Sequence, residues 1–172
     1  MVKPVQLAAL LLGGLVCCCA AAAPDFLRPV NYDIWFSLDA GWSVVAELEL
    51  AEVDLGTTLN WLYRPWGVHV GWGYRGGLDD HLRCLYARAG WSPLLDDWRI
   101  IGGGYIGETW FRADPGDGVR EDLLELGGYL ELVVPLWKGL RLRARLCGGA
   151  LRSSVRDWAA VWRLDGGVCF FL

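Results

Sequence analysis

Apolar and polar residues alternate along the chain with a period of two, which is typical of a β-strand with two unlike faces. The longest run extends from residue 32 to residue 50. Its even positions are Tyr32, Ile34, Phe36, Leu38, Ala40, Trp42, Val44, Ala46, Leu48 and Leu50. Its polar odd positions are Asp33, Ser37, Asp39, Ser43, Glu47 and Glu49. The pattern predicts an all-β domain over residues 31–172.

The same alternation returns in the last third of the chain, where the polar face becomes strongly charged. The apolar positions include Leu124, Leu126, Leu130, Leu132, Leu140, Leu142, Leu146, Trp162 and Leu164. The charged positions between them are Glu125, Glu131, Arg141, Arg143, Arg145, Arg163 and Asp165. A sheet built from these strands has one apolar face and one charged face.

Glycine, proline and polar clusters divide the pattern into strands. We expect eight strands, at 31–43, 54–64, 67–75, 82–91, 98–111, 123–136, 139–151 and 158–171. Compact turns are expected at 64–67, 92–97 and 136–139, and looser connections at 75–80, 112–122 and 152–157. A further loop is expected between 41 and 54. Short and long connections then alternate, so both ends of the domain lie on the side of the short turns.

The first 22 residues have the features of a secretory signal peptide. Lys3 precedes an apolar stretch that ends at Cys19, and the alanines that follow offer an A-x-A cleavage site. We therefore expect a signal peptide at 1–22 and a linker at 23–30. The alternatives are an uncleaved N-terminal anchor and a lipoprotein signal in which Cys17, Cys18 or Cys19 is lipidated.

Composition narrows the function classes. Hydrophobic residues make up 54% of the chain and charged residues 21%, which suits interleaved faces. A net charge of −4 and the lack of basic runs argue against nucleic-acid binding. Beyond the export segment, Cys84, Cys147 and Cys169 have no metal-ligand spacing, so neither a metal nor a cofactor is expected.

Tryptophan placement favours a membrane barrel over a soluble sandwich or lipocalin-like barrel, which the alternation alone would also fit. The tryptophans next to the short turns are Trp61, Trp66, Trp91, Trp98 and Trp137. Indole rings at one common depth are typical of an interfacial aromatic girdle. Since strands can cross hydrocarbon only as a closed barrel, we predict an eight-stranded antiparallel transmembrane up-and-down β-barrel in the outer membrane of a diderm bacterium.

On these features the chain from residue 31 resembles the small eight-stranded outer-membrane proteins, such as the OmpA barrel, OmpX and OmpW. It differs at the end, Val168-Cys169-Phe170-Phe171-Leu172, where members of that group usually close with an aromatic residue. The resemblance implies a monomer whose partners are outer-membrane lipid and the outer-membrane assembly machinery, with small solutes as candidate cargo.

If the apolar face meets lipid, the charged face lines the lumen. The predicted lumenal set is Asp33, Asp39, Glu47, Glu49, Glu125, Glu131, Arg141, Arg143, Arg145, Arg163 and Asp165, with Glu131 near Arg143 or Arg145. A barrel of this size is only wide enough to be filled by side chains. A plug of ion pairs is therefore the favoured interpretation, and a narrow channel whose arginines set selectivity is the alternative.

Two other functions stay open at this point. His69 is expected to face the lumen, but the sequence around it lacks the serine two residues on that the lipid A deacylase pattern requires, so no catalytic residue is predicted. The charged connection from Arg112 to Asp122 could bind a host or other ligand at the surface.

In the fourth strand Arg83 and Arg88 have opposite parity, so one of them must point towards lipid.

Overall fold

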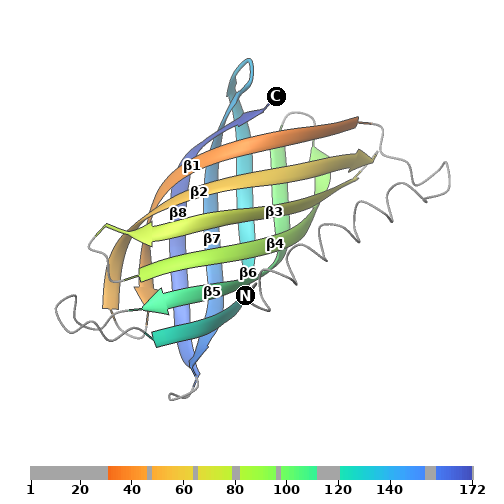
Figure 1. Cartoon of the computed structure of the whole chain (residues 1–172). Helices are drawn as coiled ribbons and strands as arrows, with labels where there is room; N and C mark the ends of the chain where they lie inside the picture. The colour runs from red at the N-terminus through yellow and green to blue at the C-terminus, as the bar shows by residue number, and fades with distance from the viewer. Residues whose placement is uncertain are drawn as a thin grey trace, which may run out of the picture.

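The computed structural model describes residues 31–45, 48–63, 66–78, 82–95, 98–111, 121–153 and 158–171. The eight strands are β1 (Asn31–Val45), β2 (Leu48–Tyr63), β3 (Trp66–Gly77), β4 (Leu82–Leu95), β5 (Trp98–Phe111), β6 (Glu121–Trp137), β7 (Leu140–Ser153) and β8 (Ala159–Phe171) (Figure 1). The expected signal peptide and linker lie outside the described residues. No helix in the described part of the chain has both the length and the apolar character needed to cross a bilayer.

The strands form one closed antiparallel barrel in sequence order (Figure 1). Each strand pairs with the next, and β1 also pairs with β8, where Trp35 lies opposite Phe171. Closure gives each of the eight described strands a partner strand on both sides, as a barrel in hydrocarbon requires. The predicted eight-stranded up-and-down barrel is confirmed.

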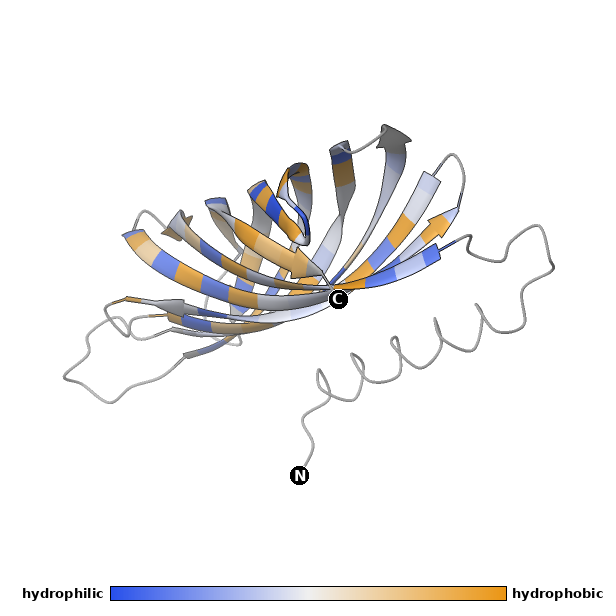
Figure 2. Ribbon diagram, turned by 90° about the horizontal axis from the view of Figure 1, so that it is seen from above, coloured by the Kyte–Doolittle hydropathy of each residue, from blue (hydrophilic) through white to orange (hydrophobic). Residues whose placement is uncertain are grey.

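The two faces of the barrel wall differ in chemistry, and the alternation is visible as successive orange and blue bands along the strands (Figure 2). In β6 up to Val133, and in β7 and β8, most odd-numbered side chains point inward and are buried, whereas most even-numbered ones point outward and are exposed. A register shift between Pro135 and Trp137 turns Trp137 outward. The outward positions of β8 from Ala160 to Phe170 are all apolar or glycine. The apolar residues therefore cover the outside of the barrel, and the charged residues fill the inside.

The apolar outer surface has a charged rim at one end. Four exposed residues on outward positions mark this rim: Glu49, Arg83, Asp122 and Arg152. Arg83 is thus the arginine of β4 that points outward, and Arg88 points inward, 5% exposed. A cation at the end of a strand can extend its side chain towards a polar headgroup layer.

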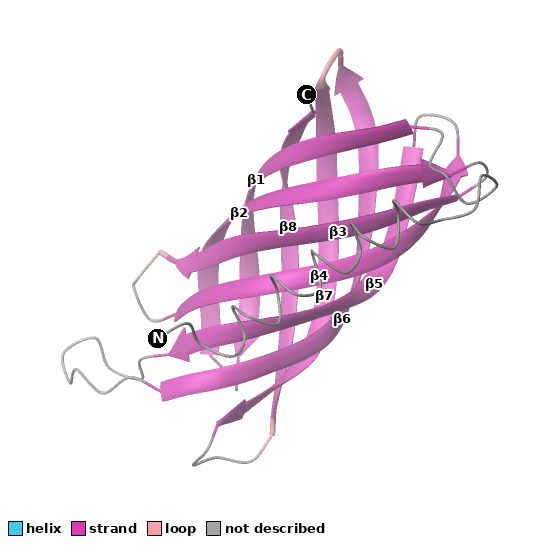
Figure 3. Cartoon of the chain, turned by 45° about the vertical axis from the view of Figure 1, so that its right-hand side comes forward, coloured by secondary structure: helices cyan, strands magenta, loops and turns pink. Residues whose placement is uncertain are grey.

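The connections differ between the two ends of the barrel, whose strands are seen from the side in Figure 3. At the end that we call the turn end, two residues separate β2 from β3, β4 from β5, and β6 from β7. In the last of these turns Gly139 has a φ of 77°, a left-handed conformation that glycine adopts without steric cost. At the opposite end, the loop end, residues 78–81, 112–120 and 154–158 connect the other strand pairs.

The first connection at the loop end lies within the expected range, 41–54, but is shorter than predicted. The strands were expected to end at 43 and to begin at 54, whereas β1 continues to Val45 and β2 begins at Leu48, which leaves two residues between them. Val45 and Leu48 are direct partners in the ladder. Partners share a face, so the inward parity changes from odd in β1 to even in β2.

Glycines let lumenal tyrosines lie flat against the barrel wall. A side chain at Gly73 would meet the hydroxyl of Tyr86 at 2.5 Å, and one at Gly127 would meet that of Tyr105 at 2.6 Å. The rings therefore occupy the volume that a second side chain would need, which is how a narrow lumen can hold large residues.

Candidate functional site in the barrel interior

The centre of the lumen is a cluster of charged side chains that come from seven of the eight strands. Its carboxylates are Asp39, Glu52, Asp54, Glu125, Glu131 and Asp165, and its guanidinium groups belong to Arg75, Arg88, Arg143, Arg145 and Arg163. None of these residues is more than 5% exposed. Six acids and five arginines nearly neutralise one another, as buried charges must.

The pair closest to the loop end joins Glu125 of β6 to Arg163 of β8. The two groups meet in two parallel contacts, of which Arg163 Nη2 to Glu125 Oε2 measures 2.9 Å. Thr109 donates a further hydrogen bond to Glu125 Oε2 at 2.9 Å, and Arg163 Nε lies 3.3 Å from Glu52 Oε2. Ser43 completes the layer by donating to Glu52 Oε1 at 2.7 Å. A bidentate arginine–carboxylate pair fixes both side chains.

In the middle of the lumen Arg145 bridges two carboxylates. Its Nη2 lies 2.5 Å from Asp54 Oδ2 and 2.8 Å from Asp165 Oδ2. Arg75 also contacts Asp54 at 3.2 Å, and the Tyr86 hydroxyl donates to Asp54 Oδ1 at 2.7 Å. Because Asp54 is on β2 and Arg145 is on β7, this contact spans the lumen between strands that are not neighbours.

A third ionic group lies nearer the turn end. Arg143 Nε donates to Asp39 Oδ1 at 3.0 Å and its Nη1 lies 3.7 Å from Glu131. Arg88 forms an ion pair with Glu131 and donates to Thr58 Oγ1 at 2.7 Å. Glu131 therefore links β4 to β7 through the lumen.

Next to this group lies a neutral chain of three buried residues on adjacent strands. His69 Nδ1 is 2.6 Å from Asn60 Oδ1, and His69 Nε2 is 2.7 Å from Ser92 Oγ. The Asn60 amide nitrogen faces the carbonyl oxygens of Asp33 and Thr58, so its oxygen faces His69. That orientation puts the imidazole proton on Nδ1 and makes Ser92 the donor to Nε2.

A serine, a histidine and an amide in this order could in principle form a nucleophile, a base and a group that orients the base. However, Ser92 is 0% exposed, and His69 and Asn60 are each 1% exposed. A substrate carbonyl has no path to Ser92 in this arrangement. The hydrogen bonds among Asn60, His69 and Ser92 give these buried polar side chains the partners that a polar interior requires.

Buried apolar side chains lie on both sides of the charged cluster along the lumen. Towards the loop end the cluster of buried residues comprises Val45, Leu50, Leu82, Cys84, Tyr86, Leu123, Leu151 and Val161. Towards the turn end Trp35 is 1% exposed and belongs to a second cluster of buried residues, together with Ile101 and Val133. Arg99 stacks over the Trp35 ring at 4.7 Å and pairs with Asp33 at 3.5 Å. In the part of the chain that the structure describes, the central charges therefore lie between two clusters of buried apolar residues.

The structure places most of the predicted lumenal residues inside the barrel: Glu125, Glu131, Arg143, Arg145, Arg163 and Asp165 are buried, and Arg141 is half-buried with its guanidinium 5.8 Å from the Trp35 ring. Glu49 is exposed on the outer face, so its predicted lumenal position is wrong. The cause is the change of parity at the two-residue connection between β1 and β2. Glu47 lies outside the described residues.

The five predicted girdle tryptophans lie on outward positions at the turn end. Trp91, Trp98 and Trp137 are 54%, 56% and 79% exposed. Trp61 and Trp66 are half-exposed, and Trp66 stacks on Tyr63 with a ring distance of 4.4 Å. Trp158 and Trp162 lie on the outer face at the loop end.

Several residues of the interior were not predicted from the sequence: Glu52, Asp54, Asn60, Arg75, Arg88, Ser92 and Arg99. Those of β2 were missed because the parity of β1 was extended to residue 50, and the strand expected from 54 was assigned no inward face. Ser92 was assigned to a turn, whereas β4 continues to Leu95. Reading even positions of β2 and β4 as inward would have found Glu52, Asn60 and Ser92.

Comparisons with known proteins give the fold but no sequence relative. No protein-family model matches the chain, and no curated protein matches it. Among solved structures, Neisserial surface protein A is 10% identical, with a TM-score of 0.58 over 81% of this chain and 96% of that chain. Ail of Yersinia pestis is 14% identical (TM-score 0.45; 81% and 97% covered), and OprG of Pseudomonas aeruginosa is 13% identical (TM-score 0.45; 84% and 97% covered).

Only Neisserial surface protein A supports an argument about the fold, because the other two TM-scores are lower than 0.5. Its structure and this one agree over nearly the whole of that protein, and the closed antiparallel ring of eight strands is present in full. The resemblance predicted from the sequence is therefore confirmed at the level of architecture. This chain has the fold of the small eight-stranded outer-membrane β-barrel proteins.

Proposed function

We propose that the protein is an integral outer-membrane β-barrel of a diderm bacterium whose lumen is closed by its own side chains. The observation that carries this proposal is the inversion of its two faces. Large apolar side chains such as Leu130, Trp162 and Leu164 are 55–59% exposed on the outside, while charged residues are buried inside. A soluble barrel would place these sets the other way round.

Membrane insertion is tested by fractionation and by electrophoresis. We expect the protein to sediment with outer membranes and to require detergent for extraction. It should also migrate differently on a denaturing gel before and after boiling, because a closed barrel resists the detergent until it is heated. A chain that stays in solution without detergent would overturn the proposal.

The ion-paired interior supports a plug over a channel. Six carboxylates and five guanidinium groups neutralise one another at contact distance, and a conducting path would have to break several of these pairs. In planar bilayers we expect the wild-type protein to pass no steady ion current. A steady current whose selectivity changes in Arg143→Gln would show a pore and would contradict the plug.

Because a closed lumen cannot transport a solute, we assign the cellular role to the surface of the barrel and to its loop end. We propose a structural or surface-binding role, in which the rigid barrel displays the connections at 78–81, 112–120 and 154–158. In bacteria that display the protein, removal of residues 114–119 should abolish the binding of these bacteria to host cells or extracellular ligands. The heat-dependent gel shift should persist, which would show that the shortened protein still folds. Unchanged binding would move the role to the outer face of the barrel.

Hydrolysis is the second candidate, because Asn60, His69 and Ser92 have the order of a catalytic triad. The burial of Ser92 argues against it. A fluorophosphonate probe is therefore expected to leave wild-type Ser92 unlabelled, and membrane lipids are expected to be the same in wild-type cells and in a His69→Ala strain. Labelling of Ser92 would make this protein an enzyme.

A further inference from the structure

Arg152 of β7 lies on the outer face of the barrel at the loop end, and its side chain is exposed. Its guanidinium carbon lies 5.5 Å from the centre of the Trp158 ring, which is also exposed. Among the described residues no carboxylate forms an ion pair with Arg152, although Asp122 is exposed on the neighbouring strand β6. Stacking on an aromatic ring orders an arginine and leaves its N–H donors available. This part of the rim therefore offers an ordered positive charge to an anion.

Next to this arginine, the outer face of β7 and β8 has one row of small side chains. Ala150 and Ala160 form this row as direct ladder partners, and Ala160 is exposed. The next row towards the turn end pairs Gly148 with Trp162, whose ring leans over that glycine, since a Cβ there would lie 2.6 Å from the ring. Successive outward positions of a strand are about 7 Å apart. The two alanines thus form the floor of a notch between the indole rings of Trp158 and Trp162, which we call the β7–β8 notch.

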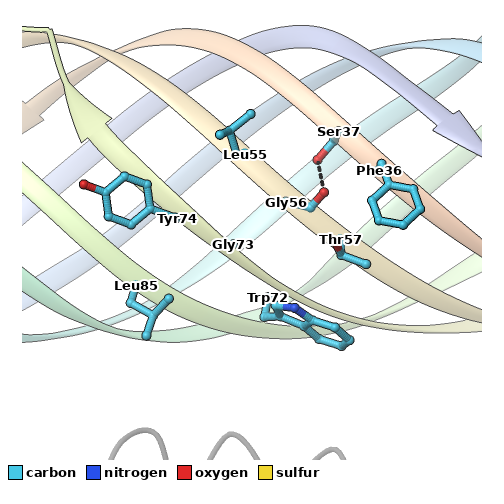
Figure 4. A pocket seen from close by; sticks show the side chains of 9 residues that line it. All are labelled: Phe36, Ser37, Leu55, Gly56, Thr57, Trp72, Gly73, Tyr74 and Leu85. Carbon is cyan, nitrogen blue, oxygen red and sulfur yellow. Dashed lines mark hydrogen bonds between the residues drawn. The ribbon is translucent and has the colours of Figure 1, made fainter.

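A second depression of the outer face has similar walls but no charge. It lies on β1 to β4, and the side chains that line it include Phe36, Leu55, Trp72 and Leu85 (Figure 4). None of the described residues that line it is charged. Both depressions have aromatic walls on the face that would meet hydrocarbon, whereas the β7–β8 notch also has a guanidinium group at its loop end. The groove of Figure 4 is therefore an internal control for the effect of that charge.

We propose that the β7–β8 notch binds a lipid whose head group carries a phosphate. The phosphate accepts hydrogen bonds from Arg152, and an acyl chain lies over Ala150 and Ala160 between the two indole rings. The longer connections of outer-membrane barrels face the outside of the cell, so this lipid belongs to the outer leaflet. A notch with a floor of one row admits a single alkyl chain, whereas the convex wall of a second barrel is too broad to enter it. This inference rests on the membrane location proposed above.

The head-group contact is tested by native mass spectrometry of the full chain. The protein is released from detergent micelles that contain either phosphatidic acid or a diacylglycerol with the same acyl chains. We expect the wild type to prefer phosphatidic acid about tenfold, which corresponds to about one charge-assisted hydrogen bond. Arg152→Gln should lose this preference, and Arg152→Lys should keep part of it. Arg83→Gln is the matched control and should behave as the wild type, because Arg83 is exposed at the same rim but on β4, where it already has a partner within the chain.

The apolar contact is tested by filling the floor of the notch. Ala160→Phe places a ring between Trp158 and Trp162 and should lower the fraction of barrels that retain phosphatidic acid about tenfold, since the acyl chain loses contact for about two methylene groups. Thr57→Phe adds the same ring to the groove of Figure 4 and should retain lipid as the wild type does. The gel shift on boiling shows that each variant is folded, and Ala150→Leu fills the same floor should Ala160→Phe not fold.

A wild type without preference for phosphatidic acid would overturn the inference, and so would equal preferences in Arg152→Gln and Arg83→Gln. Equal lipid retention in Ala160→Phe and Thr57→Phe would overturn it as well. A dimer that disappears in Arg152→Gln while lipid retention is unchanged would assign the notch to a second copy of the chain, and would also overturn it. These outcomes leave the membrane location intact. Wild-type protein that needs no detergent would instead remove the location, and the lipid site with it.

Discussion

The polar network of the lumen has a charged half, made of ion pairs, and a neutral half, made of the chain of Asn60, His69 and Ser92, and the two solve the same problem by different chemistry. Towards the loop end, buried charges such as Glu125 and Arg163 pair with one another. Towards the turn end, the neutral residues Asn60, His69 and Ser92 form a hydrogen-bonded chain. Both halves are buried, so both must satisfy every polar group from within the barrel.

The two halves also differ in which strands they connect. The neutral chain links β2, β3 and β4, which are already joined by backbone ladders. The ion pairs reach across the lumen, as Arg145 of β7 does to Asp54 of β2. The comparison teaches that the charged half braces the barrel across its diameter, whereas the neutral half reinforces one sector of its wall.

The largest expected effect comes from breaking one of the ion pairs that cross the lumen. Glu125→Ala leaves Arg163 with an uncompensated buried charge, and we expect the free energy of unfolding to fall by about 3 to 5 kcal/mol. Urea titration of the protein in lipid vesicles, followed by tryptophan fluorescence, measures it. Glu49→Ala removes an exposed carboxylate from the outer face and should change stability by about 0.5 kcal/mol or less. Equal losses in the two variants would mean that the lumenal pair contributes nothing particular.

A smaller loss is expected from the neutral half. Ser92→Ala removes the donor to His69 Nε2 and leaves a buried acceptor unsatisfied, which costs about 1 to 3 kcal/mol. The same titration applies, with Thr57→Val as the control because its hydroxyl lies on the outer face. A loss as large as that of Glu125→Ala would erase the distinction between the two halves.

The smallest expected effect leaves both halves untouched. Gly139→Ala forces a side chain into the left-handed conformation at φ 77° and should cost about 1 kcal/mol. Gly102→Ala is its control, because a Cβ there meets nothing within 4 Å. Should Gly139→Ala prove neutral, turn geometry would be irrelevant to the stability of the barrel, and the lumen alone would account for it.

The period-two pattern predicted the fold because it is a local property of each strand. It gave the inward face of β6, β7 and β8 correctly, since glycine or polar residues mark every connection there. It failed between β1 and β2, where Ala46 and Glu47 include neither glycine nor proline, so the reversal of the chain left no signal. The loop was expected between 41 and 54, but its position was not located, and the position of a two-residue turn decides the face of every residue that follows it, up to the next connection.

The pairing of lumenal charges could not be derived from the pattern at all. The sequence placed Glu131 near Arg143 or Arg145 from the β6–β7 hairpin, and Arg143 does lie 3.7 Å from it. Its other partner, Arg88, belongs to β4, and only the closure of the ring brings β4 opposite β7. Contacts across a lumen depend on strand number and stagger, which are properties of the assembled barrel.

The pairing of β1 with β8 also sets the order of events when the chain folds. Trp35 can meet Phe171 only after residue 171 has been synthesised, so no partial chain can close the ring. Until then β1 and the latest strand to form both offer unpaired backbone groups that invite aggregation. On the membrane location proposed above, the chain must therefore be protected from aggregation until it reaches the bilayer, and closure of the ring removes the need for that protection.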